Sequence, residues 1–156
     1  MRDGTPLPKD VDINSSWVRE AVDPNNTLPK VNLDISPDNI PARGTLIFTK
    51  YDVANEGNVI GELTVNTNKI QKTAWTNRVN INEELRGKGY GLSAYVTAIE
   101  MCLKEGITFR THDWSQTAEA KRVWEILADK GVAIVVEPFT PDGTGRYNGH
   151  YEVRPR

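Results

Sequence analysis

Apolar and polar residues alternate along two stretches in the first half of the chain, and each stretch predicts a β-strand. The stretches are residues 45–53 and 59–66, and both are rich in β-branched side chains. Alternation with a period of two is typical of a strand that is buried on one face. The intervening sequence Asn-Glu-Gly-Asn at 55–58 predicts a tight hairpin turn. A third strand is predicted over 73–81.

The spacing of apolar residues changes to three and four after Gly91, which predicts a helix. Gly106 predicts the end of this helix. Its buried face is expected to carry Leu92, Tyr95, Val96, Ile99, Cys102 and Leu103. Cys102 is therefore expected to be an inert core residue rather than a nucleophile.

A strand at 107–112 and a second helix follow in the prediction. The expected N-cap of that helix is Asp113 or Ser115, and its apolar face is expected to carry Ala120, Val123, Trp124 and Leu127. Two last strands are predicted at 133–139 and 150–153. Several strands followed by helix, strand, helix and two strands predict a mixed sheet covered by helices.

The first 43 residues differ in composition from the rest of the chain. Residues 1–43 hold six of the nine prolines and many Asp and Asn residues. They predict a loop-rich, partly flexible region with one short helix near 16–22, and the first dozen residues are expected to be disordered. A chain of 156 residues is near the commonest size of a single domain, so one hydrophobic core is expected. Residues 44–156 are expected to form that folded unit.

Composition and charge exclude several classes of function. The formal net charge of -2 argues against a dedicated nucleic-acid binder, which usually has a strongly basic face. A single cysteine and two histidines argue against an internal disulfide and against a zinc site, so no metal is expected and the cytoplasm is the predicted compartment. No run of about 18 apolar residues is present, so no membrane span is expected.

A glycine-rich stretch joins the third predicted strand to the first long helix, and its chemistry is that of anion binding. Glycines let backbone N–H groups approach a ligand closely, and the first turn of a helix adds unpaired N–H donors and a positive dipole end. A pyrophosphate is the ligand that this arrangement suits. The candidate binding residues are Arg86, Gly87, Lys88, Gly89, Tyr90 and Gly91.

Two well-known phosphate-binding motifs do not fit this stretch. A dinucleotide-binding turn needs glycine where this chain has Leu92, and the Gly-Lys-Ser/Thr ending of a Walker loop is absent. The stretch resembles motif A of the GNAT acyltransferase superfamily, whose pattern Arg/Gln-x-x-Gly-x-Gly/Ala is met by Arg86, Gly89 and Gly91. The resemblance covers roughly residues 45–154.

The sequence on both sides of the motif extends this resemblance. The apolar residues Val79 and Ile81 lie where the family has the end of a strand. The segment from Ala120 and Trp124 to Gly131 is similar to the second conserved helix of the family and the glycine that ends it.

The resemblance implies a fold and an activity. The fold is α/β of the α+β type: one GNAT-like domain whose mixed, mostly antiparallel sheet has flanking helices and splays in the middle, between the strands at 73–81 and 107–112. The implied cofactor is acetyl-coenzyme A, whose pantetheine arm would lie in that opening. Backbone groups of Val79 and Ile81 would pair with the arm, and an N–H there would polarise the acetyl carbonyl.

The implied reaction is acetyl transfer to a primary amine by direct attack in a ternary complex. The acceptor, a small molecule or a protein, and the oligomeric state, with a homodimer as one possibility, stay open. A catalytically inactive cofactor- or protein-binding module of the same fold, or a relative that transfers another group, is the alternative.

The sequence departs from the family where a proton donor is expected. Many members carry a tyrosine on the second conserved helix, and the equivalent position here is Trp124, whose indole N–H cannot serve as an acid. The candidate catalytic residues are His112, Glu62 and Tyr147. Tyr147, with Tyr151 as an alternative, is the candidate acid, and Glu62 or His112, with Asp113 or an ordered water chain as alternatives, is the candidate base because the strand at 73–81 offers no carboxylate. Each has a structural alternative: His112, for example, is also suited to a simple hydrogen bond in a loop.

Overall fold

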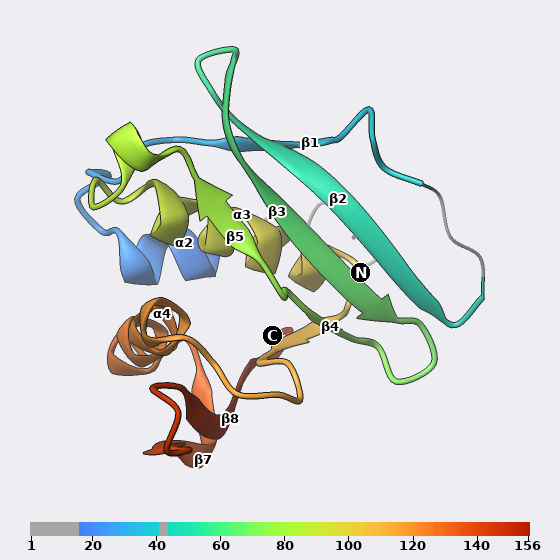
Figure 1. Ribbon diagram of the computed structural model, residues 1–156, viewed down its shortest axis with the longest axis vertical. Coiled ribbons are helices and arrows are strands. Elements are labelled where there is room, and N and C mark those ends of the chain that lie inside the picture. The colour runs from blue at the N-terminus through green and yellow to red at the C-terminus, as the bar shows by residue number, and fades with distance from the viewer. Residues whose placement is uncertain (1–15, 41–43) are drawn as a thin grey trace, which may run out of the picture.

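The computed structural model describes residues 16–40 and 44–156, and these form one eight-stranded sheet with helices packed on it (Figure 1). The order across the sheet is β1-β2-β3-β4-β6-β8-β7, and β5 also pairs with β3. Only β4 and β6 are parallel; all other pairs are antiparallel. The predicted mixed, mostly antiparallel sheet is confirmed. The strands are β1 Asn32–Ile35, β2 Leu46–Asn55, β3 Asn58–Asn68, β4 Thr73–Trp75, β5 Val79–Ile81, β6 Thr108–Arg110, β7 Ile134–Pro141 and β8 Tyr147–Val153.

The β2–β3 hairpin closes with the two-residue turn that the sequence predicts. Asn55 and Asn58 are the last paired residues, and between them Glu56 and Gly57 have φ angles of 51° and 85°. Two consecutive positive φ angles match the right-handed twist of the flanking strands. The hairpin therefore fixes the register of the two longest strands locally.

Helices cover the core face of the sheet. They are α2 Trp17–Val22, the short 3-10 helix η1 Glu83–Leu85, α3 Tyr90–Lys104 and α4 Ala118–Asp129. Helix α3 packs on α2, β1, β5 and β6, whereas α4 packs on β7 and β8 (Figure 1). The largest fully buried side chains come from both the sheet and the helices and include Leu63, Ile99, Phe109, Trp124 and Leu127.

Strand β1 lies in the region for which the sequence predicts loops and one short helix. Leu33 and Ile35 pair with Val53 and Tyr51 of β2. Val31, Leu33 and Ile35 alternate with polar residues, but the alternating stretch is short and has Pro29 and Pro37 on either side, so it was not predicted as a strand. Long-range pairing with β2 makes it a strand.

The predicted third strand at 73–81 is wrong as a single element. It is divided into β4 and β5 at residues 76–78, because the Thr76 hydroxyl donates a hydrogen bond to the carbonyl oxygen of Arg78 (3.2 Å) and accepts one from its N–H (3.3 Å). The Thr76 hydroxyl thus occupies the N–H of Arg78, a donor that a continuous strand would use in the ladder. The interruption lets β4 pair with β6 while β5 stays with β3.

The predicted caps of α4 are also wrong. Thr117 is the N-cap, and its hydroxyl accepts a hydrogen bond from Ala120 N–H (3.1 Å). The Asp113 carboxylate instead pairs with Arg110 (3.0 Å), and Ser115 has a separate partner described below. The helix starts later than predicted, so Thr117 has the capping position.

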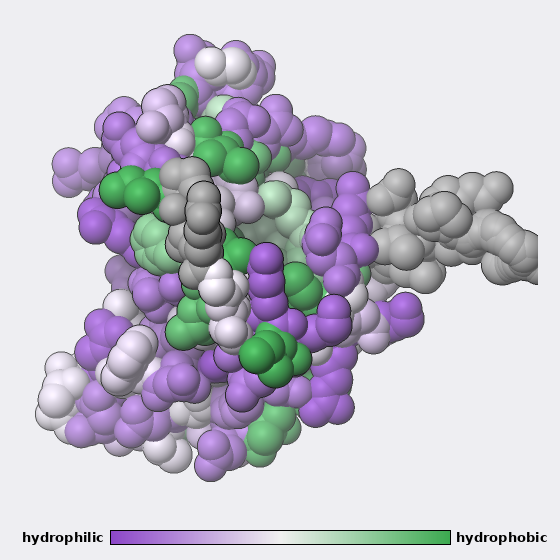
Figure 2. Space-filling model, turned by 90° about the vertical axis from the view of Figure 1, so that its right-hand side faces the viewer, coloured by the Kyte–Doolittle hydropathy of each residue, from purple (hydrophilic) through white to green (hydrophobic). Residues whose placement is uncertain are grey.

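Apolar side chains on the face shown in Figure 2 are scattered among polar ones. The exposed large apolar residues of the described chain include Ile70 and Trp114, which is 71% exposed. Scattered apolar residues of this kind are normal on protein surfaces. Within residues 16–40 and 44–156, no helix is long and apolar enough to cross a membrane.

Candidate active site

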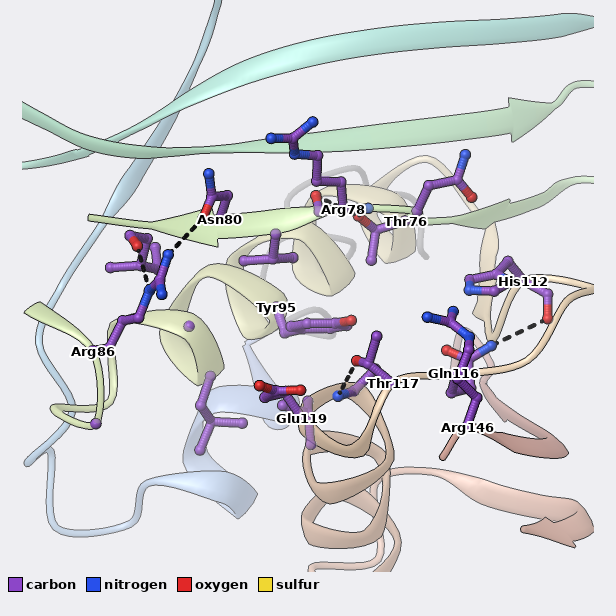
Figure 3. A pocket seen from close by; sticks show the side chains of 18 of the residues that line it. Thr76, Arg78, Asn80, Arg86, Tyr95, His112, Gln116, Thr117, Glu119 and Arg146 are labelled. Carbon is purple, nitrogen blue, oxygen red and sulfur yellow. Dashed lines mark hydrogen bonds between the residues drawn. The ribbon is translucent and has the colours of Figure 1, made fainter. Parts of the chain in front are cut away.

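The sheet opens between β5 and β6, where the sequence analysis expects it to. Strands β4 and β6 pair only at Thr73 with Thr108 and at Ala74 with Phe109. Beyond these pairs a cleft of about 560 Å³ is present. Strand β5 forms one wall, the start of α4 and the segment before it form the other, and α3 lies beneath (Figure 3).

Backbone hydrogen bonds show which edge of β5 is free. The carbonyl oxygen of Arg78 accepts from Thr64 N–H (3.1 Å), and Asn82 N–H donates to the carbonyl oxygen of Ile60 (2.8 Å). Hydrogen-bonded residues alternate along an antiparallel pair, so Asn80, midway between these positions, also directs its backbone groups to β3. The backbone N–H and C=O groups of the residues in between point to the opposite edge of β5, away from β3.

Val79 and Ile81 are those intervening residues, and both line the cleft. The Ile81 carbonyl oxygen accepts a hydrogen bond from Arg86 Nε (2.9 Å). The Arg86 guanidinium is held further by Nη2, which donates to Asn80 Oδ1 (3.1 Å). The N–H and C=O of Val79 and the N–H of Ile81 thus face the cleft as an unpaired strand edge.

The glycine turn, residues 86–91, lies at one end of the cleft. Within the described chain, no backbone hydrogen bond from the N–H groups of Gly87, Lys88 or Gly89 is present. Helix α3 follows directly, and the N–H groups of its first turn have no partner within the helix. Gly87 and Gly89 have φ angles of 77° and 91°, a left-handed conformation that glycine adopts readily.

A segment from the N-terminal region supports this turn. The buried Asp23 carboxylate accepts hydrogen bonds from Thr27 N–H (2.8 Å), from the Thr27 hydroxyl (3.0 Å) and from Leu28 N–H (3.0 Å). The bonds from Thr27 and Leu28 lower the pKa of Asp23. A Cβ atom on Gly89 would lie 3.0 Å from Leu28 Cδ2 and 3.2 Å from Pro29 Cδ. A side chain at this position would therefore need Leu28 and Pro29 to shift, in addition to a left-handed backbone.

His112 lines the opposite end of the cleft, near Arg146 (Figure 3). Burial lowers the pKa of His112, and the charges of Arg146 and Arg110 lower it further, against the opposing effect of Asp113. His112 Nδ1 accepts a hydrogen bond from Trp114 N–H (3.1 Å). An accepting Nδ1 assigns the proton of the neutral ring to Nε2.

Partly buried hydrogen bonds hold the segment that carries His112. Gln116 is 2% exposed, and its Nε2 donates to the carbonyl oxygen of Trp114 (3.1 Å). Arg146 Nε donates to the Ser115 hydroxyl (2.8 Å). These contacts connect the segment before α4 to the β7–β8 hairpin and fix the wall of the cleft.

No protein-family model matches the chain, and no curated protein sequence matches it. Solved structures do match it. An acetyltransferase from Bacillus subtilis in complex with CoA has a TM-score of 0.52 and 14% identity, over 70% of this chain and 78% of that one. IAA acetyltransferase from Bacillus cereus has a TM-score of 0.50 and 15% identity, over 69% of this chain and 77% of that one.

The chain has the GNAT fold. The sequence resemblance predicts this fold, and the structural neighbours are GNAT acetyltransferases. At 14–15% identity the likeness shows the fold alone. The chemistry must therefore be argued from this chain's own residues.

Some of the predicted cofactor-binding residues line the cleft, and others do not. Val79, Ile81, Arg86, Gly87 and Gly91 line it. The remaining three residues, Lys88, Gly89 and Tyr90, belong to the same turn and the start of α3 but do not line the cleft. That these residues bind the cofactor stays a prediction.

Of the three candidate catalytic residues, only His112 lines the cleft. Glu62 forms an ion pair with Lys50 (3.3 Å). Tyr147 has the Lys121 ammonium 5.0 Å from its ring centroid. The structure thus does not bring Glu62 and Tyr147 together with His112.

Trp124 and Cys102 are core residues of this GNAT fold. Trp124 is 1% exposed and stacks on Phe109 with ring centroids 5.9 Å apart. Burial raises the pKa of Cys102 to about 12, with a smaller contribution from Glu105. Within the described residues, no group of three or more His, Cys, Asp or Glu residues is placed to hold a metal ion.

Sequence reasoning missed several residues that line the cleft. Arg146, Gln116 and Thr117 lie in segments whose sequence carries no motif. Tyr95 was assigned to the buried face of α3 by its spacing, which is correct, but the same spacing cannot show that its side chain also borders the cleft. The i, i+4 relation of Tyr95 to Gly91 of the glycine turn was the available signal.

Proposed function

We propose that this chain is an acetyl-CoA-dependent N-acetyltransferase that moves an acetyl group to a primary amine by direct attack in a ternary complex. The observation that carries the proposal is the cleft itself, which has an unpaired strand edge at Val79 and Ile81 and a turn of free N–H donors at its end. A pantetheine arm carries amides that suit a strand edge, and a pyrophosphate suits the turn.

The residues present fit acetyl-CoA, which is a substrate of the proposed reaction and supplies the acetyl group as a thioester. The N–H groups of 87–89 and of the first turn of α3 would bind its pyrophosphate. The role of Arg86 would be partly structural, because its guanidinium already bonds Ile81 and Asn80. The N–H of Val79 is suited to polarise the thioester carbonyl.

At the other end of the cleft, His112 would act on the acceptor. Its lowered pKa keeps the ring neutral near pH 7, and Nε2 then offers a hydrogen-bond donor. A neutral imidazole of this tautomer is suited to position the amine or a water molecule. To take a proton at Nδ1, it would have to give up the bond from Trp114.

The test is calorimetry with CoA and with acetyl-CoA on the parent and on Gly89→Glu. A side chain at Gly89 meets Leu28 and Pro29, and its carboxylate adds negative charge to the turn. We expect binding to be lost. Gly106→Glu is the matched control, because Gly106 also has a positive φ (74°) but has open space around it at the far end of α3.

Equal loss of binding in both variants would trace the effect to backbone strain or to charge in general. Unchanged binding by folded Gly89→Glu would show that the cofactor binds elsewhere. Turnover with a panel of primary amines then separates the enzyme from a catalytically inactive module, which would bind CoA and release no acetylated product.

A further inference from the structure

Tyr95 is a buried tyrosine whose hydroxyl borders the cleft. It lies in the second turn of α3 and is 8% exposed. Its ring packs edge-on against Phe109, with centroids 6.5 Å apart. The ring is therefore held by the core while its hydroxyl end points into the cleft (Figure 3).

The Tyr95 hydroxyl makes no hydrogen bond to any residue of the described chain. In Figure 3 it points to the middle of the cleft, with Thr76 on the β5 side and Thr117 on the α4 side. The Thr117 hydroxyl accepts a hydrogen bond from Ala120 N–H, and the Thr76 hydroxyl donates one to the carbonyl oxygen of Arg78. A phenol in the interior usually has a partner, so this donor is available to a ligand.

Its position along the cleft is beyond the glycine turn. Tyr95 is one helical turn after Gly91, so both lie on the same face of α3. Helix α3 runs back along β5 from the glycine turn, and both elements line the cleft. A ligand that enters at the turn and extends along the Val79 edge reaches the level of the Tyr95 hydroxyl.

The proposed reaction needs a proton donor near the sulfur of the thioester. A thiolate leaves when the thioester is cleaved, and protonating it as it leaves favours the forward direction. Trp124, in the position where a tyrosine is common, is 1% exposed, does not line the cleft and has no acidic proton. Tyr147 and Tyr151 do not line the cleft either.

Building on the acetyltransferase function proposed above, we propose that Tyr95 is the catalytic residue that protonates the departing thiolate. The amine nitrogen forms a bond to the acetyl carbon, and the bond between that carbon and sulfur breaks with its electron pair on sulfur. Tyr95 Oη gives its proton to sulfur. The proton lost by the amine nitrogen returns to the phenolate through water, so the products are the amide and free CoA.

Burial raises the pKa of the Tyr95 phenol, so the phenol keeps its proton between turnovers and is present as a donor. The charged and titratable groups that also line the cleft are Arg78 and Arg86 from the β5 side, Glu119 from α4, and His112 and Arg146 at the far end. His112 is the only other neutral donor among them, and its proton is on Nε2 at the acceptor end.

The test uses CoA itself, so it needs no knowledge of the acceptor. The ultraviolet absorbance of the thiolate reports the pKa of the CoA thiol in the complex, with the desulfo-CoA complex as the blank. A hydrogen bond from the Tyr95 hydroxyl would stabilise the CoA thiolate and lower the pKa of the thiol. Tyr95→Phe removes this bond, so it should raise the thiol pKa by about one to two pH units. The affinity for CoA, measured by calorimetry at neutral pH, should stay within a few-fold of the parent value.

Tyr51→Phe is the matched control, because Tyr51 is a partly buried tyrosine on β2 that does not line the cleft. It should leave the thiol pKa unchanged. Difluorotyrosine at position 95 keeps the hydroxyl but is a stronger acid, so it should lower the thiol pKa. This second variant keeps the shape of the side chain if Tyr95→Phe does not fold.

An identical thiol pKa in the parent and in folded Tyr95→Phe, with CoA bound to both, overturns the assignment and leaves the proposed function standing. Failure of the parent to bind CoA overturns the proposed function, and the role of Tyr95 with it. With any amine that supports turnover, Tyr95→Phe should lower kcat about 10²–10⁴-fold. The KM for acetyl-CoA should change little.

Discussion

Replacing Gly89 by alanine should destabilise the protein through two separate effects. Gly89 has φ of 91°, and a left-handed backbone costs a residue with a Cβ about 1–2 kcal/mol. The new methyl group would also press on Leu28 Cδ2 at 3.0 Å and on Pro29 Cδ at 3.2 Å. Overpacking of this kind typically costs about 1–3 kcal/mol. The expected loss in the free energy of unfolding is therefore about 2–5 kcal/mol.

Gly106→Ala separates the two effects. Gly106 has φ of 74°, but nothing lies within 4 Å of a Cβ built there. This control should lose only the backbone part, about 1–2 kcal/mol. Urea unfolding followed by circular dichroism gives both values. In thermal melts, each kcal/mol lowers the Tm of a chain of this size by about 2–4 °C.

A double-mutant cycle identifies the contact responsible for the difference. Leu28→Ala removes Cδ2, so it should cost less in the Gly89→Ala background than in the parent. Equal destabilisation by Gly89→Ala and Gly106→Ala, or strict additivity with Leu28→Ala, would refute the conclusion that residues 28–29 buttress the glycine turn. CoA affinity, measured on the same proteins, shows whether that packing matters for binding.

Three further predictions concern the wall of the cleft. Thr117→Ala should lower the free energy of unfolding by about 0.5–2 kcal/mol through loss of the α4 cap, and Thr117→Ser should restore most of it in the same melts. Trp124→Phe should cost less than the about 3–5 kcal/mol of a truncation to alanine, and the pH profile of turnover should not change, because the buried indole donates no proton; a lost limb of that profile would contradict this. The pKa of His112 is lowered by burial and by Arg146, so just below pH 6.5 the folded protein binds fewer protons than the unfolded chain, and stability should fall as the pH falls through that window. In urea unfolding at pH 7.5 and 5, His112→Gln should remove part of this fall, and an identical pH dependence in both proteins would rule the histidine out as its source.

Local patterns determined much of this fold because their physical causes are local. The Asn55 to Asn58 turn was predictable, since two positive φ angles there match the twist of the flanking strands. The register of α3 was predictable from its apolar spacing, and Gly106 with its φ of 74° ends the helix as expected. The glycine turn carried enough local chemistry to indicate an anion site and to suggest the fold.

Tertiary structure decided the features that depend on partners far away in the sequence. Strand β1 forms through its pairing with β2. The break at 76–78 separates β4, which pairs with β6, from β5, which pairs with β3. Whether a candidate residue borders the cleft was equally a matter of long-range geometry: His112 does, and Glu62 does not.

Tyr95 illustrates the division between sequence and tertiary structure. Its spacing along α3 correctly predicted a buried ring, since helical periodicity determines which face packs on the sheet. Periodicity does not determine where that sheet opens. The opening arises because β4 stays paired with β6 for only two residues, and it places the tip of a core side chain at the edge of a cleft.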